Sequence, residues 1–550
     1  MRRLISLFSS FATVSVFLGK ALAQEAHPGC IQANVQLNNP RQYDVIVFGD
    51  EVPGVMTAVK VKRELEQKTG TAKVALITEG DTDKGIGGHL VRGGLAYLDR
   101  NQSPPGLREE LGTFGATSQL YQEFLDVTGT DAVALDRFRA AQAFNYLFWK
   151  EQIALIDDVE LETVATANQF VCSLTTSHHG SFVASQFIDA TQGGKLAEIS
   201  GVEMAMGFAQ LGLPDSSLSV GWVFEAYGSI EQLKQIEAEL IERFLDNNDR
   251  QAQNWLATAT GNDPDQLAYF ERSLTNRYGQ PATLYQVTPD SADVRSLALS
   301  AGYHGCVGTL FNLRKTPAVL DRANVAVLSD RLSINALLFD VSATQARELS
   351  HNGSQPTAQM REIADQVATC FQRLGFQRIE FMDELYIRNV GQIAASLDDL
   401  TATKMADGGV PAAEALGTFA YHFDFRGGIA GLDEKMADAG IHDIDTFLMP
   451  IFNYGFRHTL PVEYQNLAVL GPASGFGGLG TTAGRIVEFN ISVGEGLAIA
   501  AAIAIAEGRS LHTVTNQEVK QALGYTPRIY GRPTSSWFDV FTVERKLREF

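Results

Sequence analysis

The 550-residue chain is poor in basic residues and has no run rich in lysine or arginine. Lysine and arginine together number 44 against 64 aspartates and glutamates, which gives a formal net charge of −20. Proteins that bind nucleic acid or an anionic membrane surface need a basic footprint. The composition therefore argues against both kinds of partner.

Cysteine is also scarce, and no C-x-x-C pair occurs. This absence argues against zinc and iron–sulfur centres, and we predict no metal site. The four cysteines are Cys30, Cys172, Cys306 and Cys370. Two disulfides, one or none are all compatible with the sequence, and it does not choose among the possible pairings.

Apolar runs of membrane-spanning length are missing from the body of the chain. The almost wholly apolar segment GEGLAIAAAIAIAEG, residues 494–508, contains only ten consecutive apolar residues. A spanning helix needs about 20. We therefore expect a buried core helix there and no membrane span in the mature chain.

The first residues have the pattern of an export signal. Arg2 and Arg3 precede an apolar stretch interrupted by serines, and Ala21-Leu22-Ala23 forms an A-x-A cleavage motif. We expect residues 1–23 to be a signal peptide cleaved near Ala23, with export to the periplasm or the medium. A membrane anchor and twin-arginine export are the alternatives.

Strand and helix patterns at the two ends of the chain belong to one fold. After a polar linker at 24–40, the sequence predicts a buried strand at 43–48, a helix at 54–67 and a second strand at 73–78. Residues 466–471 read as another buried strand. Between them, residues 201–450 mix helical and β-rich segments. The sequence thus predicts a discontinuous parallel sheet with a large insertion.

The first strand leads into a variant of the dinucleotide-binding turn. Gly49 and Gly54 allow the tight turn and the close approach of the helix, but Glu51 stands where the middle glycine is usual. The helix start, with Val52 and Pro53, attracts phosphate through its free N–H groups. We expect Glu51 to weaken that binding without abolishing it.

Two further segments fit the same kind of site. Glu79 follows the second strand, where an acidic side chain accepts hydrogen bonds from the adenosine ribose; a solvated loop carboxylate is the alternative. The glycine-rich GIGGHLVRGGLAYLD, residues 85–99, suits a backbone lying against a flat ligand, and Gly87, Gly88 and His89 belong to it.

Four stretches together carry a resemblance to a known family: DVIVFGDEVPGVMTA, GGHLVRGGL, FIDATQGGKLAEISG and YGFRHTLPVEYQNLAVLGPASGFGGLGTTAGRIVEFNISVGEGLAIAAAIA. The chain resembles the FAD-dependent oxidoreductases of the glutathione-reductase-like Rossmann superfamily. Gln192 departs from the family, which usually has glycine there. The resemblance implies an α/β fold: a Rossmann-like FAD-binding domain in two parts, 41–200 and 451–510, an inserted α+β substrate or cap domain at 201–450, and a tail at 511–550.

The resemblance also implies where FAD is held. A helix beginning near Gly494 would point its N-terminus at the flavin, where negative charge develops on reduction, and Arg485 would assist. His89 is a weaker candidate for covalent flavin attachment. The remaining expected contacts are Ala190, Thr191, Gly471, Pro472 and Ala473.

The implied reaction is hydride transfer from a small organic substrate to flavin N5, followed by reoxidation by an unknown external acceptor. His422 and His458 are the candidate bases, and Arg457 is a candidate ligand for a substrate carboxylate. Each of the three also has an ordinary structural interpretation. An NAD-dependent dehydrogenase and an exported non-catalytic binding protein that kept the fold are the alternative functions.

Overall fold

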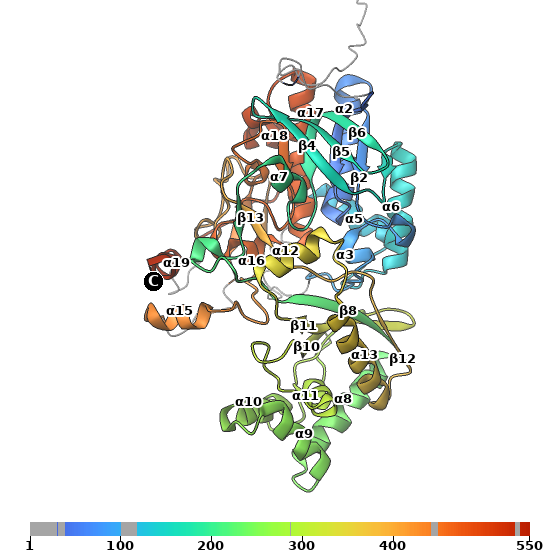
Figure 1. Cartoon of the computed structure of the whole chain (residues 1–550), viewed down its shortest axis with the longest axis vertical. Coiled ribbons are helices and arrows are strands. Elements are labelled where there is room, and N and C mark those ends of the chain that lie inside the picture. The colour runs from blue at the N-terminus through green and yellow to red at the C-terminus, as the bar shows by residue number, and fades with distance from the viewer. Residues whose placement is uncertain are drawn as a thin grey trace, which may run out of the picture.

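The computed structural model of the protein describes residues 30, 39–100, 118–286, 288–441, 449–533 and 540–549. The predicted signal peptide, residues 1–23, and most of the predicted linker at 24–40 lie outside the described residues. The described residues form two large sheets, one above the other in Figure 1, and two small strand pairs. The upper sheet uses strands from both ends of the described chain, as the sequence predicts.

The upper sheet is a parallel sheet extended by a β-meander. Its strand order is β3-β2-β1-β6-β5-β4, and β16 pairs with β6 beside β5. The pairings of β1 with β2 and β6, of β2 with β3 and of β6 with β16 are parallel. The strands are β1 (Arg41–Phe48), β2 (Val74–Ile77), β3 (Ala154–Ile156), β4 (Leu161–Ala167), β5 (Phe170–Thr176), β6 (Gly180–Asp189) and β16 (Leu467–Val469).

Alternation along β1 buries both faces of this sheet. Val45 and Val47 pack into a core with the flanking helices, whereas Ile46 and Phe48 pack into a second core on the opposite face. Burial on both faces explains why the strand reads as a continuous apolar run. The helices of this part are α2 (Val52–Thr69), α3 (Gly88–Val91), α5 (Gln119–Thr128), α6 (Arg137–Glu151), α7 (Lys195–Ser200), α16 (Thr481–Gly484), α17 (Val487–Glu507) and α18 (Asn516–Ala522).

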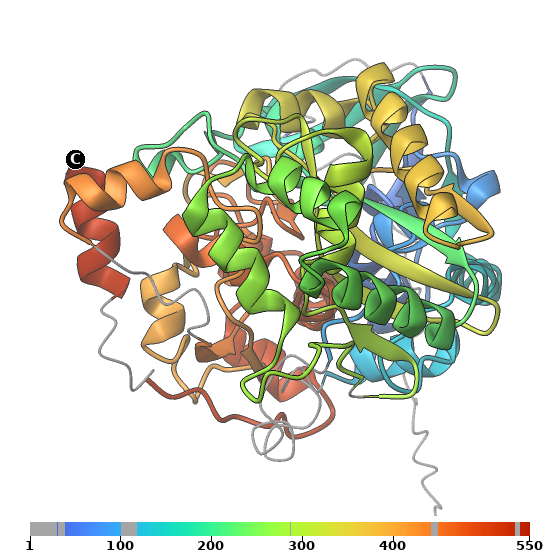
Figure 2. The same ribbon diagram turned by 90° about the horizontal axis from the view of Figure 1, so that it is seen from below.

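The lower sheet is antiparallel, with order β12-β8-β11-β10-β9, and has its own apolar core. Seen from below, α8–α10 lie nearest to the viewer (Figure 2). The helical periodicity predicted in two segments of the insertion is confirmed by α8 and α13. The elements are β8 (Val220–Tyr227), β9 (Ser291–Asp293), β10 (Ala318–Val327), β11 (Arg331–Phe339), β12 (Arg378–Phe381), α8 (Ile230–Leu245), α9 (Arg250–Thr260), α10 (Pro264–Leu274), α11 (Ala298–Val307), α12 (Ala343–His351) and α13 (Ala358–Arg373).

Short elements join these two parts and complete the described chain. Two strand pairs form small sheets, β7 with β13 and β14 with β15. The C-terminal helix α19 contacts α14 and lies near α15 at one side of the molecule (Figure 1). These elements are β7 (Met204–Met206), β13 (Gly391–Ile393), β14 (Gly417–Ala420), β15 (Ile451–Tyr454), α14 (Ala402–Ala406), α15 (Leu432–Asp438) and α19 (Val540–Glu549).

The apolar helix α17 is a core helix. By length and composition it is the one described helix able to cross a membrane, but 89 % of its most apolar window is buried inside the protein. It packs mainly against α2 and also contacts α5 and α18. Its first residue is Val487, so the prediction of a helix start near Gly494 is wrong. Asn490, Ser492 and Glu495 resemble loop residues in sequence, but tertiary contacts bury them within the helix.

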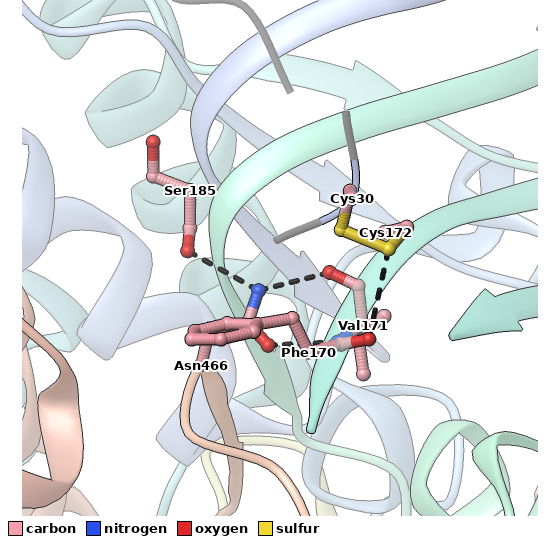
Figure 3. Close-up of a disulfide and its surroundings, with 6 residues drawn as sticks. All are labelled: Cys30, Phe170, Val171, Cys172, Ser185 and Asn466. Carbon is pink, nitrogen blue, oxygen red and sulfur yellow. Dashed lines mark hydrogen bonds between the residues drawn. A yellow bond between two sulfur atoms is a disulfide. The ribbon is translucent and has the colours of Figure 1, made fainter. Parts of the chain in front are cut away.

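Both cysteine pairs form disulfides, which settles the pairing that the sequence leaves open. Cys306 in α11 is bonded to Cys370 in α13, and Cys30 is bonded to Cys172 in β5. Beside the Cys30–Cys172 disulfide, the side-chain amide of Asn466 accepts a hydrogen bond from the Val171 N–H at 2.8 Å and donates to the carbonyls of Val171 and Ser185 (Figure 3). Asn466 thereby ties the start of β16 to β5 and β6.

Candidate active site

The candidate site begins where the parallel strands of the upper sheet end. Phe48, the last residue of β1, pairs with Asp189 of β6, which pairs in turn with Val469 of β16. Carboxyl ends of neighbouring parallel strands lie at one edge of a sheet, and open α/β sheets bind ligands there. The loops after β1, β6 and β16 therefore meet, although they are hundreds of residues apart in the sequence.

Glycine at two positions of the first loop is required by crowding. Gly49 has φ +97°, and a Cβ there would lie 2.8 Å from the backbone of Ala190. A Cβ at Gly54 would overlap the Ala190 side chain. These two glycines let the start of α2 lie directly against the loop after β6. The predicted turn therefore forms in spite of its unusual sequence.

The charge of Asp50 is balanced inside the protein. Its carboxylate is 2.5 Å from Arg92 Nη1 and accepts from the Thr78 hydroxyl at 2.8 Å and the Gly87 N–H at 3.0 Å. Burial alone would raise the pKa of Asp50, but the charge and hydrogen bonds of Arg92 lower it to about 2. Gly88 donates more weakly to the same carboxylate, at 3.4 Å. Gly87 and Gly88 thus hold Asp50.

Glu51 turns its carboxylate onto α3. Its Oε2 lies 2.6 Å from His89 Nδ1 and accepts from the His89 backbone N–H at 3.3 Å. A Cβ at Gly88 would overlap this carboxylate. No side chain caps the start of α2, where Val52 and Pro53 are the first residues. The free N–H groups of the first turn remain available to an anion.

Two narrow cavities and one large cavity follow one another from this edge. The narrow cavities, of about 60 and 10 Å³, share Glu51, Ala190, Thr191 and Gln192; we call them together the strand-end groove. The large cavity, of about 780 Å³, shares Arg485 with the groove. The three cavities therefore lie next to one another, beginning at the ends of β1 and β6.

Glu79 lines the first part of the strand-end groove. Its carboxylate lies 2.7 and 2.6 Å from Lys195 Nζ and accepts from the Leu161 N–H at 2.9 Å. Sequence reasoning missed Lys195. Lys195 follows β6 in the sequence, and nothing near it in the sequence indicates that it pairs with Glu79, 116 positions away.

The second part of the groove contains His89, Gln192, Gly471 and Pro472. The Gln192 amide nitrogen lies 2.5 Å from His89 Nδ1, and the His89 ring stacks on Tyr386 at 5.1 Å between centroids. Ala473 lies just behind the groove, where its carbonyl accepts from Ile393. Gly471 has φ +130°, and the nearest atom to a Cβ there is 4.0 Å away.

The beginning of α17 also reaches the groove, but Gly494 does not. Val487 and Asn490 line the second narrow cavity. Gly494 lies farther along α17, at its crossing with α2, where a Cβ would overlap the Thr57 hydroxyl. Gly494 therefore lets two helices approach, and the described residues of α17 that line the groove are Val487 and Asn490 in its first turn.

Arg485 stands between the groove and the large cavity. It donates to the Tyr386 hydroxyl at 2.6 Å and pairs with the Asp424 carboxylate at 2.5 Å, while its Nε has no hydrogen-bond partner. Burial by itself would lower the pKa of Arg485, but Tyr386 and Asp424 raise it. The side chain is a fixed positive charge.

Asp99, which sequence reasoning did not predict as a site residue, also lies in the wall of the large cavity. It accepts a hydrogen bond from the Tyr421 hydroxyl at 3.0 Å. Burial, with the carboxylates of Glu488 and Asp424 nearby, raises the pKa of Asp99 to about 8. Such a group is protonated at neutral pH. The short YLD ending of the glycine-rich segment carries no signal of this role.

Of the three predicted catalytic residues, the structure places only His422 in the large cavity. His422 stacks on Tyr421 at 4.4 Å, and burial lowers its pKa. His458 packs against Phe476 and Phe489, and is not among the described residues that line the cavity. Burial lowers its pKa to about 3.

Arg457 is likewise outside this cavity wall. It donates to the backbone carbonyls of His512 at 3.1 Å and Val514 at 2.7 Å, and so holds the segment after α17. Among the described residues, no group of three or more histidine, cysteine, aspartate or glutamate side chains is placed to hold a metal ion.

The sequence matches the FAD dependent oxidoreductase family over residues 44–523, most of its length. The chain belongs to the FAD-dependent oxidoreductase family. FAD is its cofactor. No curated protein matches the chain in sequence.

Solved structures similar to this FAD-dependent oxidoreductase are distant. Thermovibrio ammonificans THI4 is 16 % identical (TM-score 0.22), with 30 % of this chain and 66 % of THI4 covered, so the chain matches just under two thirds of that protein. The p-nitrophenol 4-monooxygenase PnpA from Pseudomonas putida DLL-E4 is 11 % identical (TM-score 0.36), with 88 % and 87 % covered. The L-proline dehydrogenase from P. horikoshii is 11 % identical (TM-score 0.33), with 89 % and 100 % covered. Such low scores say nothing about substrate or reaction.

The chemistry of the residues that line the groove suits the cofactor of this FAD-dependent oxidoreductase. The uncapped start of α2 suits the diphosphate, and Glu79 suits the ribose hydroxyls. Gly471 leaves a space that a side chain would fill. Farther along, the side-chain amide oxygen of Asn490 and Arg485 Nε are buried polar atoms that have no hydrogen-bond partner among the described residues, as expected where a ligand with polar edges binds.

Proposed function

We propose that this FAD-dependent oxidoreductase oxidises a small organic substrate in the large cavity, with hydride transfer to flavin N5 and reoxidation by an external acceptor. The observation that carries the proposal is the meeting of the strand-end groove and the large cavity at Arg485. A cavity of about 780 Å³ has the size of a small-molecule site. When bound, FAD accepts the hydride; the protein supplies position and electrostatics.

The residues around the junction divide the remaining work. Arg485 and the N-terminus of α17 would supply positive charge to a flavin bound at this junction, which becomes negative on reduction. His422 is neutral at physiological pH because its pKa is lowered, so its ring can accept a proton from the substrate. Asp99, protonated at that pH, holds a proton in the same wall.

We also propose that the protein is exported after cleavage near Ala23. The leader-like residues 1–23 and the two disulfides support this proposal, because structural disulfides persist in oxidising compartments and are rare in the cytosol.

The visible absorption spectrum of the purified mature protein tests the function first. We expect a yellow protein that releases free FAD on acid precipitation and is bleached anaerobically by a substrate and restored by an acceptor. Colour that stays in the precipitate would instead indicate covalent attachment, for which His89 is the candidate. A colourless protein that cannot be reconstituted with FAD would overturn the proposal and favour a non-catalytic binding protein.

A further inference from the structure

The large cavity is positively charged although the whole chain has a net charge of −20. Its described wall contains three aspartates, Asp99, Asp321 and Asp424, and five arginines, Arg295, Arg322, Arg388, Arg426 and Arg485. An excess of one sign of charge within low-dielectric walls raises the local concentration of ligands of the opposite sign. The lining therefore favours an anionic ligand.

Three of the five arginines are neutralised by a carboxylate. Arg485 pairs with Asp424 at 2.5 Å and Arg426 pairs with Asp321 at 2.9 Å. The exposed Arg295 pairs with Asp293, just outside the wall, at 2.7 Å. In each of these pairs the carboxylate largely neutralises the positive charge of its arginine.

Arg388 is different because it is buried and forms no ion pair within the described chain. It is 4 % exposed, and its Nε and Nη2 donate to the backbone carbonyls of Ser219 and Arg426, each at 2.8 Å. Nη2 also donates to the Ser219 hydroxyl. Burial and the charge of Arg485 lower the pKa of Arg388 to about 10, so it still carries its charge at neutral pH. The Asp424 carboxylate offsets this buried charge only in part, because it also pairs with Arg485, and an anion that binds beside Arg388 offsets it further.

Tyr386 adds a second donor in the same wall. It is two residues before Arg388 in a segment that bridges to Gly221, and both side chains line the cavity. The Tyr386 hydroxyl accepts from Arg485, which leaves its own O–H to donate. Because Nε and both N–H groups of Nη2 are already engaged, the Nη1 N–H groups of Arg388 and the Tyr386 hydroxyl are the donors that remain for a carboxylate.

We infer that the substrate of the proposed oxidation carries a carboxylate group, which Arg388 binds with help from Tyr386. This inference rests on the proposed function for the identity of the ligand as a substrate. The contact itself is a property of the cavity and can be tested without turnover. Arg388 thereby becomes the residue that sets substrate charge specificity.

Isothermal titration calorimetry on the purified protein as isolated, with its flavin content measured separately, tests the inference. The probes are butyrate, its neutral analogue butyramide, and inorganic phosphate. We expect butyrate to bind to the wild type and to lose about 30-fold or more in affinity in Arg388→Met. Arg388→Lys should bind at an intermediate level, because a lysine keeps the charge but not the guanidinium contacts to the Ser219 and Arg426 carbonyls that hold it in place.

Two further variants separate the contact from general damage. Arg295→Gln removes a cavity arginine that already has a carboxylate partner, and we expect less than about a threefold change in butyrate affinity. Tyr386→Phe keeps the ring that stacks on His89 and removes only the hydroxyl. It should weaken butyrate binding by about 3- to 10-fold, even if Arg388→Met fails to fold.

Each outcome decides the inference. Equal binding of butyrate and butyramide, or wild-type affinity in Arg388→Met, would overturn it, as would binding of phosphate with no binding of butyrate. If the protein holds no flavin but binds butyrate through Arg388, the proposed function fails and the anion site stands. If it holds FAD and oxidises neutral substrates without binding butyrate, the proposed function stands and the anion site fails.

Discussion

At the scale of single residues, the acidic turn after β1 shows what sequence can and cannot predict. The two glycines predict the turn, because Gly49 and Gly54 are the residues that crowding against Ala190 demands. The orientation and charge balance of Asp50 and Glu51 depend on residues that are distant in the sequence. Asp50 is neutralised by Arg92, 42 positions away, and Glu51 is turned onto α3.

Residue-scale prediction was weaker in the large cavity than in the groove. His422 was found because histidine is a common base, and it lies in the wall. His458 was proposed on the same ground and lies in an aromatic cluster instead. Asp99 and Arg388 carry no motif, and only the tertiary fold brings them beside Arg485.

The pH dependence of turnover distinguishes His422 from Asp99 as the proton acceptor. The pKa of His422 is lowered below the ordinary value of about 6.5, so this base is neutral at pH 7 and above. Asp99 would become a base only as the pH rises through its pKa of about 8. We expect kcat to be flat between about pH 7.5 and 9.

Variants of His422 and Asp99 show which of the two side chains is the base. His422→Gln should lower kcat by about 10²- to 10⁴-fold, the usual contribution of a positioned base. Asp99→Asn, which keeps the shape and the Tyr421 contact, should leave the flat profile unchanged. A wild-type kcat that rises through pH 8 and loses that rise in Asp99→Asn would assign the base to Asp99 and contradict the role of His422.

At the scale of elements, the βαβ unit was predicted well and the start of α17 was not. Strand β1, helix α2 and strand β2 lie where alternation and apolar runs place them, because their local pattern and their tertiary burial agree. In the first turns of α17, the polar residues Glu488, Asn490 and Ser492 interrupt the apolar pattern, so the sequence predicts a start that is too late. Their partners come from elsewhere in the fold, as when Glu488 accepts from the Asp99 N–H at 2.9 Å.

The crossing of α17 and α2 depends on Gly494. Replacing a helical glycine by alanine ordinarily stabilises a helix by about 0.5–1 kcal/mol. Here the new methyl group would overlap the Thr57 hydroxyl, which donates to the Pro53 carbonyl at 2.6 Å. We expect Gly494→Ala to lower stability by about 1–3 kcal/mol instead, measured as a lower midpoint of chemical unfolding.

A double variant shows whether the clash is the cause. Thr57→Ala removes the hydroxyl that the methyl group meets, so the pair Thr57→Ala and Gly494→Ala should be more stable than the sum of the two single effects predicts. Additive effects, or a stabilised Gly494→Ala, would contradict the close packing of the two helices at this point.

At the scale of the whole molecule, the insertion separates the two ends of the sheet, and the disulfides tie distant parts of the chain. Alternating segments and the resemblance predicted the discontinuous fold, because β16 repeats the strand pattern of β1. Pairing of the cysteines could not be predicted, since it depends on which helices and strands become neighbours. The chain between Cys30 and Cys172 spans 142 positions, and that between Cys306 and Cys370 spans 64.

This difference gives the two bonds unequal expected effects. A disulfide stabilises mainly by restricting the unfolded chain, more so for a longer loop, so each bond should contribute about 2–5 kcal/mol. The loop lengths predict that the longer link contributes about 0.7 kcal/mol more. We therefore expect the variant Cys30→Ala with Cys172→Ala to unfold at a lower guanidinium concentration than Cys306→Ala with Cys370→Ala, and both variants to unfold at a lower guanidinium concentration than the wild type.

Free-thiol titration of the unfolded wild type supplies the control, because neither cysteine pair should react without reductant. Four reactive thiols in the protein isolated from its natural compartment would show that the bonds do not form there, and would remove their support for export.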